Sequence, residues 1–251
     1  MTLPLWGQAL ILFPVGLLAG FLNVLAGGGS LLTLPLLLFL GLPAAVANGT
    51  NRIAILCQNI FAISSFRQQG VLPLGLARDC TLPALVGGVI GAQLAVSIDD
   101  QLFRRLLALI MIGVLIITLI DPAKRLRSEE RPLKGGRKVL LFTGFFFIGL
   151  YGGFVQAGVG FIVISLLLML GIDLVRINAV KVIVILGFTV IALGVFIWHG
   201  QVSYGPGLAL AAGNALGGWI APKVAVRKGH SWINRLVSLT VFLFALKLLL
   251  G

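Results

Sequence analysis

Four consecutive residues, Gly27-Gly28-Gly29-Ser30, are the first candidates for chemistry in this chain. A glycine run lets the backbone reverse direction and pass close to a ligand. Ser30 is placed to act as the N-cap of the apolar helix expected to follow. The free N–H groups and the positive dipole end of such a helix start favour an anion. We therefore predict an anion-binding break here; the alternative is helix packing through small residues.

A second break, marked by Gly158 and Gly160, precedes an equally short apolar segment in the second half of the chain. Interrupted hydrophobic segments in corresponding positions of two halves are typical of transport sites near the middle of a bilayer. The presence of both breaks favours a binding site over simple helix packing.

Polar residues open the apolar segment that follows the first break: Asn48, Thr50, Asn51 and Arg52. Asn48, Asn51 or Arg52, and Gln58 or Asn59 recur with the period of a helix and form one polar stripe. A basic residue inside a membrane span is costly and usually faces a cavity or a partner. This stripe is therefore a candidate lining for the anion.

The second half repeats the start of this stripe with Asn178 and Lys181. Lys181 is the sharper candidate for the counter-charge of a bound anion, and Arg52 is the other. For both, the alternative is snorkelling from near a helix end. Asn23 and Gln156 stand beside the two breaks, where their amides could bind the ligand or a neighbouring helix.

Enzymatic chemistry finds little support in the sequence. It contains no catalytic-triad, HExxH or Walker A pattern and no Cys/His cluster with ligand spacing. The chain has seven acidic residues, which leaves little material for carboxylate chemistry. Cys57 and Cys80 read as small buried hydrophobes. We therefore expect no enzyme, no catalytic residue, no metal site and no cofactor.

The elements that position these residues are membrane helices. The chain is 59% hydrophobic and 10% charged, with a mean hydropathy of +1.11, whereas soluble domains carry roughly 25% charged residues. A lipid-facing surface removes the need for charge. The apolar runs do not alternate as strands of a β-barrel would. The predicted fold class is an all-α integral membrane protein.

Ten hydrophobic segments can be drawn, at residues 5–26, 30–41, 46–66, 77–98, 102–120, 139–156, 160–171, 175–198, 206–226 and 232–250. The second and the seventh hold about twelve residues each. A full crossing needs roughly 20 residues. We therefore expect these two segments to be short or re-entrant.

The two halves of the chain repeat each other in order. Residues 16–21 match residues 149–154, Asn48 matches Asn178, and the glycines of 87–91 match those of 213–218. We divide the chain into a first transmembrane repeat (1–120), a basic cytoplasmic linker (121–138) and a second transmembrane repeat (139–251). Five segments per repeat is an odd number, so the second repeat is expected to be inverted.

The net charge of +12 is spread over loops between apolar segments. Anionic lipid is therefore the expected partner of these residues, and nucleic acid is not. The linker 121–138 and the loop around 223–235 are the most basic stretches and are expected in the cytoplasm, whereas the loop 199–206 has no Lys or Arg. Both termini are then outside, in a multi-pass protein of the cell inner (plasma) membrane.

The run Ala19-Gly-Phe-Leu-Asn-Val-Leu-Ala-Gly-Gly-Gly-Ser-Leu-Leu-Thr-Leu-Pro35 resembles the signature that opens the sulfite exporter TauE/SafE family. Residues 42–51 continue it, and residues 86–95 look like that family's helix-packing block. The resemblance covers nearly the whole chain. It implies a secondary transporter for sulfite, sulfoacetate, thiosulfate or related organic acids, with binding residues at 27–30, Asn48, Thr50 and Asn51. The second half departs from the family's glycine pattern at Val159.

These observations predict a transporter that moves small sulfur-containing or organic anions by alternating access. Its partners would be the anion, membrane lipid and, as a candidate coupling ion, the proton. The alternatives are a passive anion channel and a transporter of an unrelated small organic acid. Substrate identity, direction and oligomeric state stay open.

Overall fold

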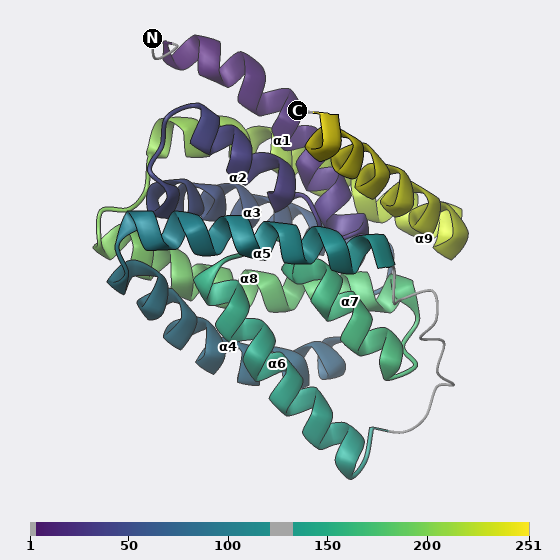
Figure 1. Cartoon of the computed structure of the whole chain (residues 1–251). Helices are drawn as coiled ribbons and strands as arrows, with labels where there is room; N and C mark the ends of the chain where they lie inside the picture. The colour runs from purple at the N-terminus through teal and green to yellow at the C-terminus, as the bar shows by residue number, and fades with distance from the viewer. Residues whose placement is uncertain (1–3, 121–132, 251) are drawn as a thin grey trace.

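The computed structural model describes the backbone of residues 4–120 and 133–250, and the side chains of these ranges apart from residues 5, 111, 114–120 and 228–250. The described residues form nine α-helices and no strand (Figure 1). The helices are α1 (Leu5–Leu25), α2 (Ser30–Phe39), α3 (Ala44–Gln68), α4 (Leu74–Ser97), α5 (Asp100–Ile120), α6 (Gly136–Phe154), α7 (Val159–Met169), α8 (Leu174–Trp198) and α9 (Tyr204–Leu250). The predicted all-α class is confirmed.

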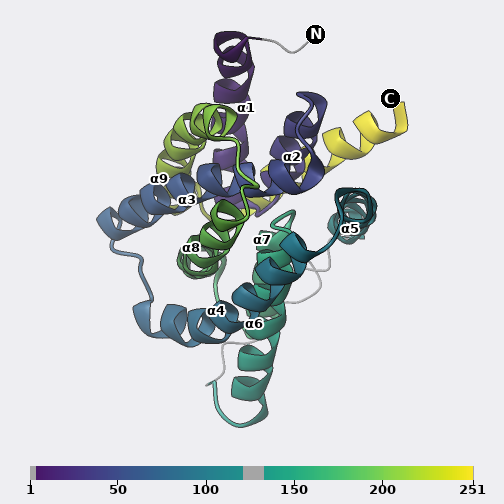
Figure 2. The same cartoon turned by 90° about the vertical axis from the view of Figure 1, so that its left-hand side faces the viewer.

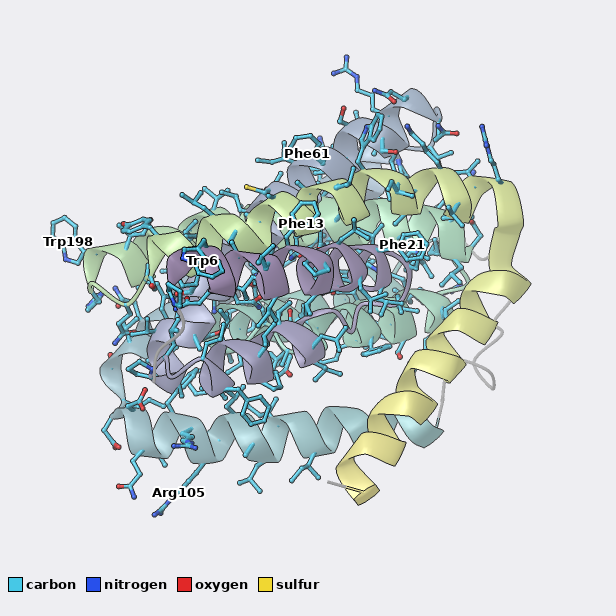
Figure 3. All side chains as sticks on the ribbon, turned by 90° about the horizontal axis from the view of Figure 1, so that it is seen from above. Trp6, Phe13, Phe21, Phe61, Arg105 and Trp198 are labelled. Atoms are coloured by element: carbon cyan, nitrogen blue, oxygen red, sulfur yellow. The ribbon has the colours of Figure 1, made fainter. Side chains whose placement is uncertain are left out.

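The last two predicted segments lie in a single helix. α9 runs without interruption from Tyr204 to Leu250 and contains both the segment at 206–226 and the one at 232–250. Residues 227–231 between them include no proline, so no backbone N–H is missing there and the helix can continue. Although the helix is continuous, its axis changes direction sharply, so that α9 has two arms (Figure 3). The described chain therefore has nine helices where the sequence predicted ten segments.

Glycines in the left-handed conformation follow α1 and α6 and mark the two breaks. Gly27 has φ +91° and Gly158 has φ +69°, values that are costly for any residue with a Cβ. The helices that follow, α2 and α7, contain 10 and 11 residues. At this length each spans about 15 Å, half of the roughly 30 Å hydrocarbon core. The prediction that the second and seventh segments are short is confirmed.

Each short helix folds back beside the helix that precedes it. Leu12 of α1 and Leu37 of α2 lie in the same core cluster. Arg137 at the start of α6 donates from Nη2 to the carbonyl of Leu170, directly after α7, over 2.9 Å. The pairs α1–α2 and α6–α7 are therefore helical hairpins with their tips at the breaks. Figure 1 shows the two hairpins entering the molecule from opposite ends.

Helix contacts in the two halves correspond to each other. The most extensive contacts join α1 with α9 and α6 with α4, followed by α3 with α9 and α8 with α4. Glycines make these contacts possible, because a Cβ on Gly213 would meet the Phe13 carbonyl and one on Gly87 would meet the Phe146 carbonyl. Small residues let membrane helices approach this closely. α3 and α8 also contact each other (Figure 2).

The outer surface of the described structure is apolar. Four of the described helices, α1, α4, α6 and α8, are long and hydrophobic enough to cross a membrane. Large hydrophobic side chains are exposed along them, including Trp6 (71%), Leu74 (66%) and Trp198 (87%). Trp6 and Trp198 lie toward the same end of the molecule (Figure 3). Tryptophan is enriched at membrane–water interfaces, and this end is accordingly a candidate interface.

Candidate functional site

The two breaks meet in the interior of the molecule. A Cβ on Gly27 would collide with the backbone of Gly160, and a Cβ on Gly160 would collide with Gly27. Gly28 lies beside the ring of Phe161, and a Cβ there would be 2.7 Å from its Cζ. The tips of the two hairpins are therefore in direct contact, as only glycine allows. Gly29 packs against Ala19 and Asn23 of α1.

Lys181 caps the broken end of α1. Its ammonium donates to the carbonyl of Val24 and to Oδ1 of Asn178, both over 2.7 Å. Asn178 donates in turn from Nδ2 to the carbonyl of Leu25 over 3.3 Å. Lys181 and Asn178 are both fully buried, so Lys181 does not snorkel to the surface. Two neighbouring residues of α8 thus bind the carbonyls that the break at Gly27 leaves without helical partners.

Arg52 and Asn48 of α3 play the same part at the end of α6. The guanidinium donates to the carbonyls of Gly152 (3.2 Å), Gly153 (2.6 Å) and Phe154 (3.4 Å). Asn48 donates from Nδ2 to the carbonyl of Phe154 over 2.9 Å. Arg52 also lies 4.6 Å from the centre of the Phe196 ring, which it faces in a cation–π contact. Each broken helix is therefore capped by a fully buried cation from the other half of the chain.

This arrangement leaves positive electrostatic potential at the breaks. The C-terminal ends of α1 and α6 carry the negative ends of their dipoles, equivalent to about half a charge each, and each faces the full positive charge of Lys181 or Arg52. The starts of α2 and α7 carry the positive ends, and neither has a side-chain cap. Across the described residues, no carboxylate is buried with the two cations. Uncompensated positive charge in a buried region favours an anion.

An amide side chain beside each break bonds to a neighbouring long helix. Asn23 donates from Nδ2 to Oε1 of Gln58 over 3.1 Å. Gln156, in the second break, donates to the hydroxyl of Thr189 on α8. All four residues are nearly or fully buried. Each amide predicted to stand beside a break is therefore bonded to α3 or α8.

Thr33, Thr189 and Tyr151 bond to the breaks or the stripe but were not among the predicted residues. Thr33 of α2 donates to Oδ1 of Asn51 over 2.7 Å, and the Tyr151 hydroxyl donates to the Ala157 carbonyl. Thr189 could have been found from the repeat. Asn48 and Asn178 are 130 positions apart, and the same spacing places Thr189 opposite residue 59 of the polar stripe. Thr33 and Tyr151 give no such signal.

Ser30 and Thr50 have different hydrogen-bonding roles from those predicted. Gly29 already has helical backbone angles, so α2 starts one residue early and Ser30 is its first helical residue instead of its N-cap. The prediction of a Ser30 cap is therefore wrong, although Ser30 is buried in the first turn of α2. Thr50 accepts from the backbone N–H of Ser203 over 2.9 Å and so fastens the loop between α8 and α9.

Cysteine and acidic side chains supply no further candidate site in the described part of the chain. Cys57 and Cys80 are free thiols; Cys80 is buried as expected, whereas Cys57 is only partly buried, so the expectation is wrong for Cys57. The described residues contain no group of three or more His, Cys, Asp or Glu side chains that could hold a metal ion. Asp173 pairs with Arg176 over 3.4 Å and caps α8. The buried polar groups described above are therefore the candidate site.

Comparison with known proteins identifies relatives along almost the full length. The model of the family described as Sulfite exporter TauE/SafE matches residues 12–248. A probable membrane transporter protein of Haemophilus influenzae is 29% identical, with 95% of this chain and 93% of the relative covered. The probable membrane transporter proteins ORF9 of Sinorhizobium sp and YfcA of Escherichia coli K12 are each 27% identical, with 95% of this chain and 91% and 88% of the relatives covered. No solved structure gives a significant match.

Proposed function

Because the chain belongs to the sulfite exporter TauE/SafE family, we propose that it is a secondary transporter that moves small anions across the membrane by alternating access. The substrates would be sulfur-containing or organic anions such as sulfite, thiosulfate or sulfoacetate. Its relatives carry the description of probable membrane transporters. The cell inner membrane is the proposed location.

The observation that carries the anion assignment is the pair of buried cations. Arg52 and Lys181 are fully buried, and each is bonded to helix-end carbonyls instead of to a carboxylate. The carbonyls satisfy the hydrogen-bonding capacity of the two cationic side chains only in part, and a carbonyl dipole carries no full negative charge. A cationic substrate would be repelled from this region. An anion beside α2, α3 and the second break would instead compensate the positive charge of the two buried side chains.

The proposed architecture consists of two inverted five-segment repeats, residues 1–120 and 139–251, with the two arms of α9 serving as the last two segments. The correspondence between the α1–α9 and α6–α4 contacts supports this proposal. So do the two hairpins that enter from opposite ends (Figure 1). Inverted repeats of this kind are typical of secondary transporters. When the two halves exchange their conformations, a structure that is open to the outside becomes one that is open to the inside.

Alternating access would require the hairpin tips to move. Gly27 and Gly160 are in contact, so an anion cannot pass between the tips in this arrangement. The cap on α1 comes from α8, and the cap on α6 comes from α3. Displacement of one hairpin would therefore break or shift its hydrogen bonds to the long buried helix of the other half.

Counterflow in proteoliposomes separates the transporter from a passive channel. Labelled sulfite, thiosulfate and alkanesulfonates are offered outside, with unlabelled anion inside. We expect saturable uptake that the internal anion accelerates, and a reduced rate in Asn51→Ala compared with the exposed control Gln68→Ala. Flux without saturation or acceleration would indicate a channel. Absence of flux for every anion would refute the proposed substrate class.

A further inference from the structure

Four buried polar atoms near the second break have no hydrogen-bond partner. They are Oδ1 of Asn48, Nδ2 of Asn51, Nε of Arg52 and Oε1 of Gln156. The three α3 side chains are 0% exposed and Gln156 is 2% exposed. Buried polar groups are normally bonded, so unpaired ones point to a partner that the protein chain does not supply.

These atoms belong to side chains that surround one junction. Asn48, Asn51 and Arg52 lie within little more than one turn of α3 and share a face. Asn48 and Arg52 both donate to the carbonyl of Phe154, at the end of α6. Gln156 follows two residues later in the break itself. The four side chains are therefore grouped where α3 meets the second break.

The first turn of α2 closes the same junction. Asn51 is bonded to Thr33 of that turn. α2 begins after Gly29 without a side-chain cap, so the positive end of its dipole is available here. The junction combines this positive end with the buried charge of Arg52.

The unpaired atoms differ in hydrogen-bonding type. Nδ2 of Asn51 and Nε of Arg52 are donors, whereas Oδ1 of Asn48 and Oε1 of Gln156 are acceptors. The orientation of the Asn48 amide is determined by its neighbour, because its Nδ2 faces the Phe154 carbonyl, which can only accept. A fully deprotonated oxyanion could satisfy the donors but would place lone pairs against the acceptors.

We propose that the species carried is a monoanion that keeps one hydrogen-bond donor, such as hydrogensulfite, and that Oδ1 of Asn48 and Oε1 of Gln156 share this single donor in a three-centre hydrogen bond. Asn51 and Arg52 donate to its charged oxygens. The inference rests on the proposed anion transport. It would also couple anion transport to protons without a buried carboxylate in the described part of the chain, because the proton travels on the substrate.

The pH dependence of sulfite counterflow in proteoliposomes of the full chain tests this inference. Sulfite loses its last proton near neutral pH, whereas methanesulfonate stays a monoanion without an O–H and serves as the control substrate. We expect KM for total sulfite to rise about tenfold for each pH unit above that titration. KM calculated for hydrogensulfite should stay constant. We also expect hydrogensulfite to be preferred over methanesulfonate by at least about tenfold, because the analogue leaves the acceptors unpaired.

A constant KM for the sulfite dianion, or equal exchange of methanesulfonate and hydrogensulfite, would overturn the inference while leaving anion transport intact. Absence of saturable exchange for any anion would instead refute the proposed function. The variant Gln156→Met should narrow the hydrogensulfite preference, and Gln68→Met, at the exposed end of α3, should retain it. If Gln156→Met does not fold, the pH series on the unaltered protein still decides.

Discussion

Arg52 and Lys181 each cap a broken helix end but bind different numbers of carbonyls. The planar guanidinium of Arg52 reaches three successive carbonyls at the end of α6. The ammonium of Lys181 binds one carbonyl of α1 and relies on Asn178 for the next. Arginine presents five donors in a fixed fork and lysine only three on a point charge. The two ends are therefore capped with unequal strength, and the α1 end depends more on its amide neighbour.

The variant Lys181→Met tests the capping role. Methionine fills a similar volume but leaves the Val24 carbonyl and Oδ1 of Asn178 buried without this donor, at a cost of about 1–3 kcal/mol for each. We expect a lower thermal unfolding midpoint in detergent together with loss of anion exchange. The control is Lys134→Met, because Lys134 is exposed. An unfolding midpoint equal to that of Lys134→Met would contradict the assigned role.

At the scale of elements, the two hairpins owe their shape to glycines that do two jobs. Gly27 takes a left-handed backbone conformation and also touches Gly160. The first property ends the helix, and the second lets the tips of the hairpins meet. The left-handed conformation alone would permit a break, but only together with the close contact does it bring two broken helices together inside a membrane protein.

These two contributions can be separated with Gly27→Ala and Gly41→Ala. Gly41 has nearly the same φ, +90°, but a Cβ there would have no heavy atom within 4 Å. The backbone cost of roughly 1–2 kcal/mol should be common to both variants. We expect Gly27→Ala to lose much more stability, measured by thermal unfolding, and to lose exchange, because its Cβ collides with Gly160. Similar losses in both variants would show that contact between the tips is unimportant.

At the scale of the whole molecule, the proposed inversion assigns corresponding residues to opposite membrane faces. Pro43 precedes α3 and Asp173 precedes α8 at the same place in the two halves, and both are exposed. A helical span separates Pro43 from Gln68, and another separates Asp173 from His199. Pro43 should therefore share a face with His199, and Asp173 should share the other with Gln68.

Labelling with a membrane-impermeant maleimide in intact cells checks this assignment. Single cysteines are introduced as Pro43→Cys, Asp173→Cys, Gln68→Cys and His199→Cys in a background with Cys57 and Cys80 replaced by alanine. We expect Pro43→Cys and His199→Cys to react from outside and the other two to react only after permeabilisation, because the loop 199–206 lacks basic residues. Reaction of Pro43→Cys and Asp173→Cys from the same face would refute the inverted arrangement.

Much of this organisation is visible in the sequence because it is encoded locally. Helix ends at Gly27 and Gly158 were indicated by glycines, which adopt the left-handed conformation without the steric cost of a Cβ. The short lengths of α2 and α7 can be counted directly in the apolar runs. Asn48, Asn51 and Arg52 were identified as a buried polar stripe from their types and period alone, and they are fully buried.

The sequence by itself therefore determined the membrane class, the two breaks and the identity of the buried polar residues. Only the tertiary structure decided which groups those residues bind. Lys181 was expected to face a ligand, yet it binds the carbonyl of Val24, 157 residues away, and the continuity of α9 could not be read from its composition. The reason is physical: helix ends depend on the conformational limits of single residues, whereas the partner of a long buried side chain depends on how the two halves pack together.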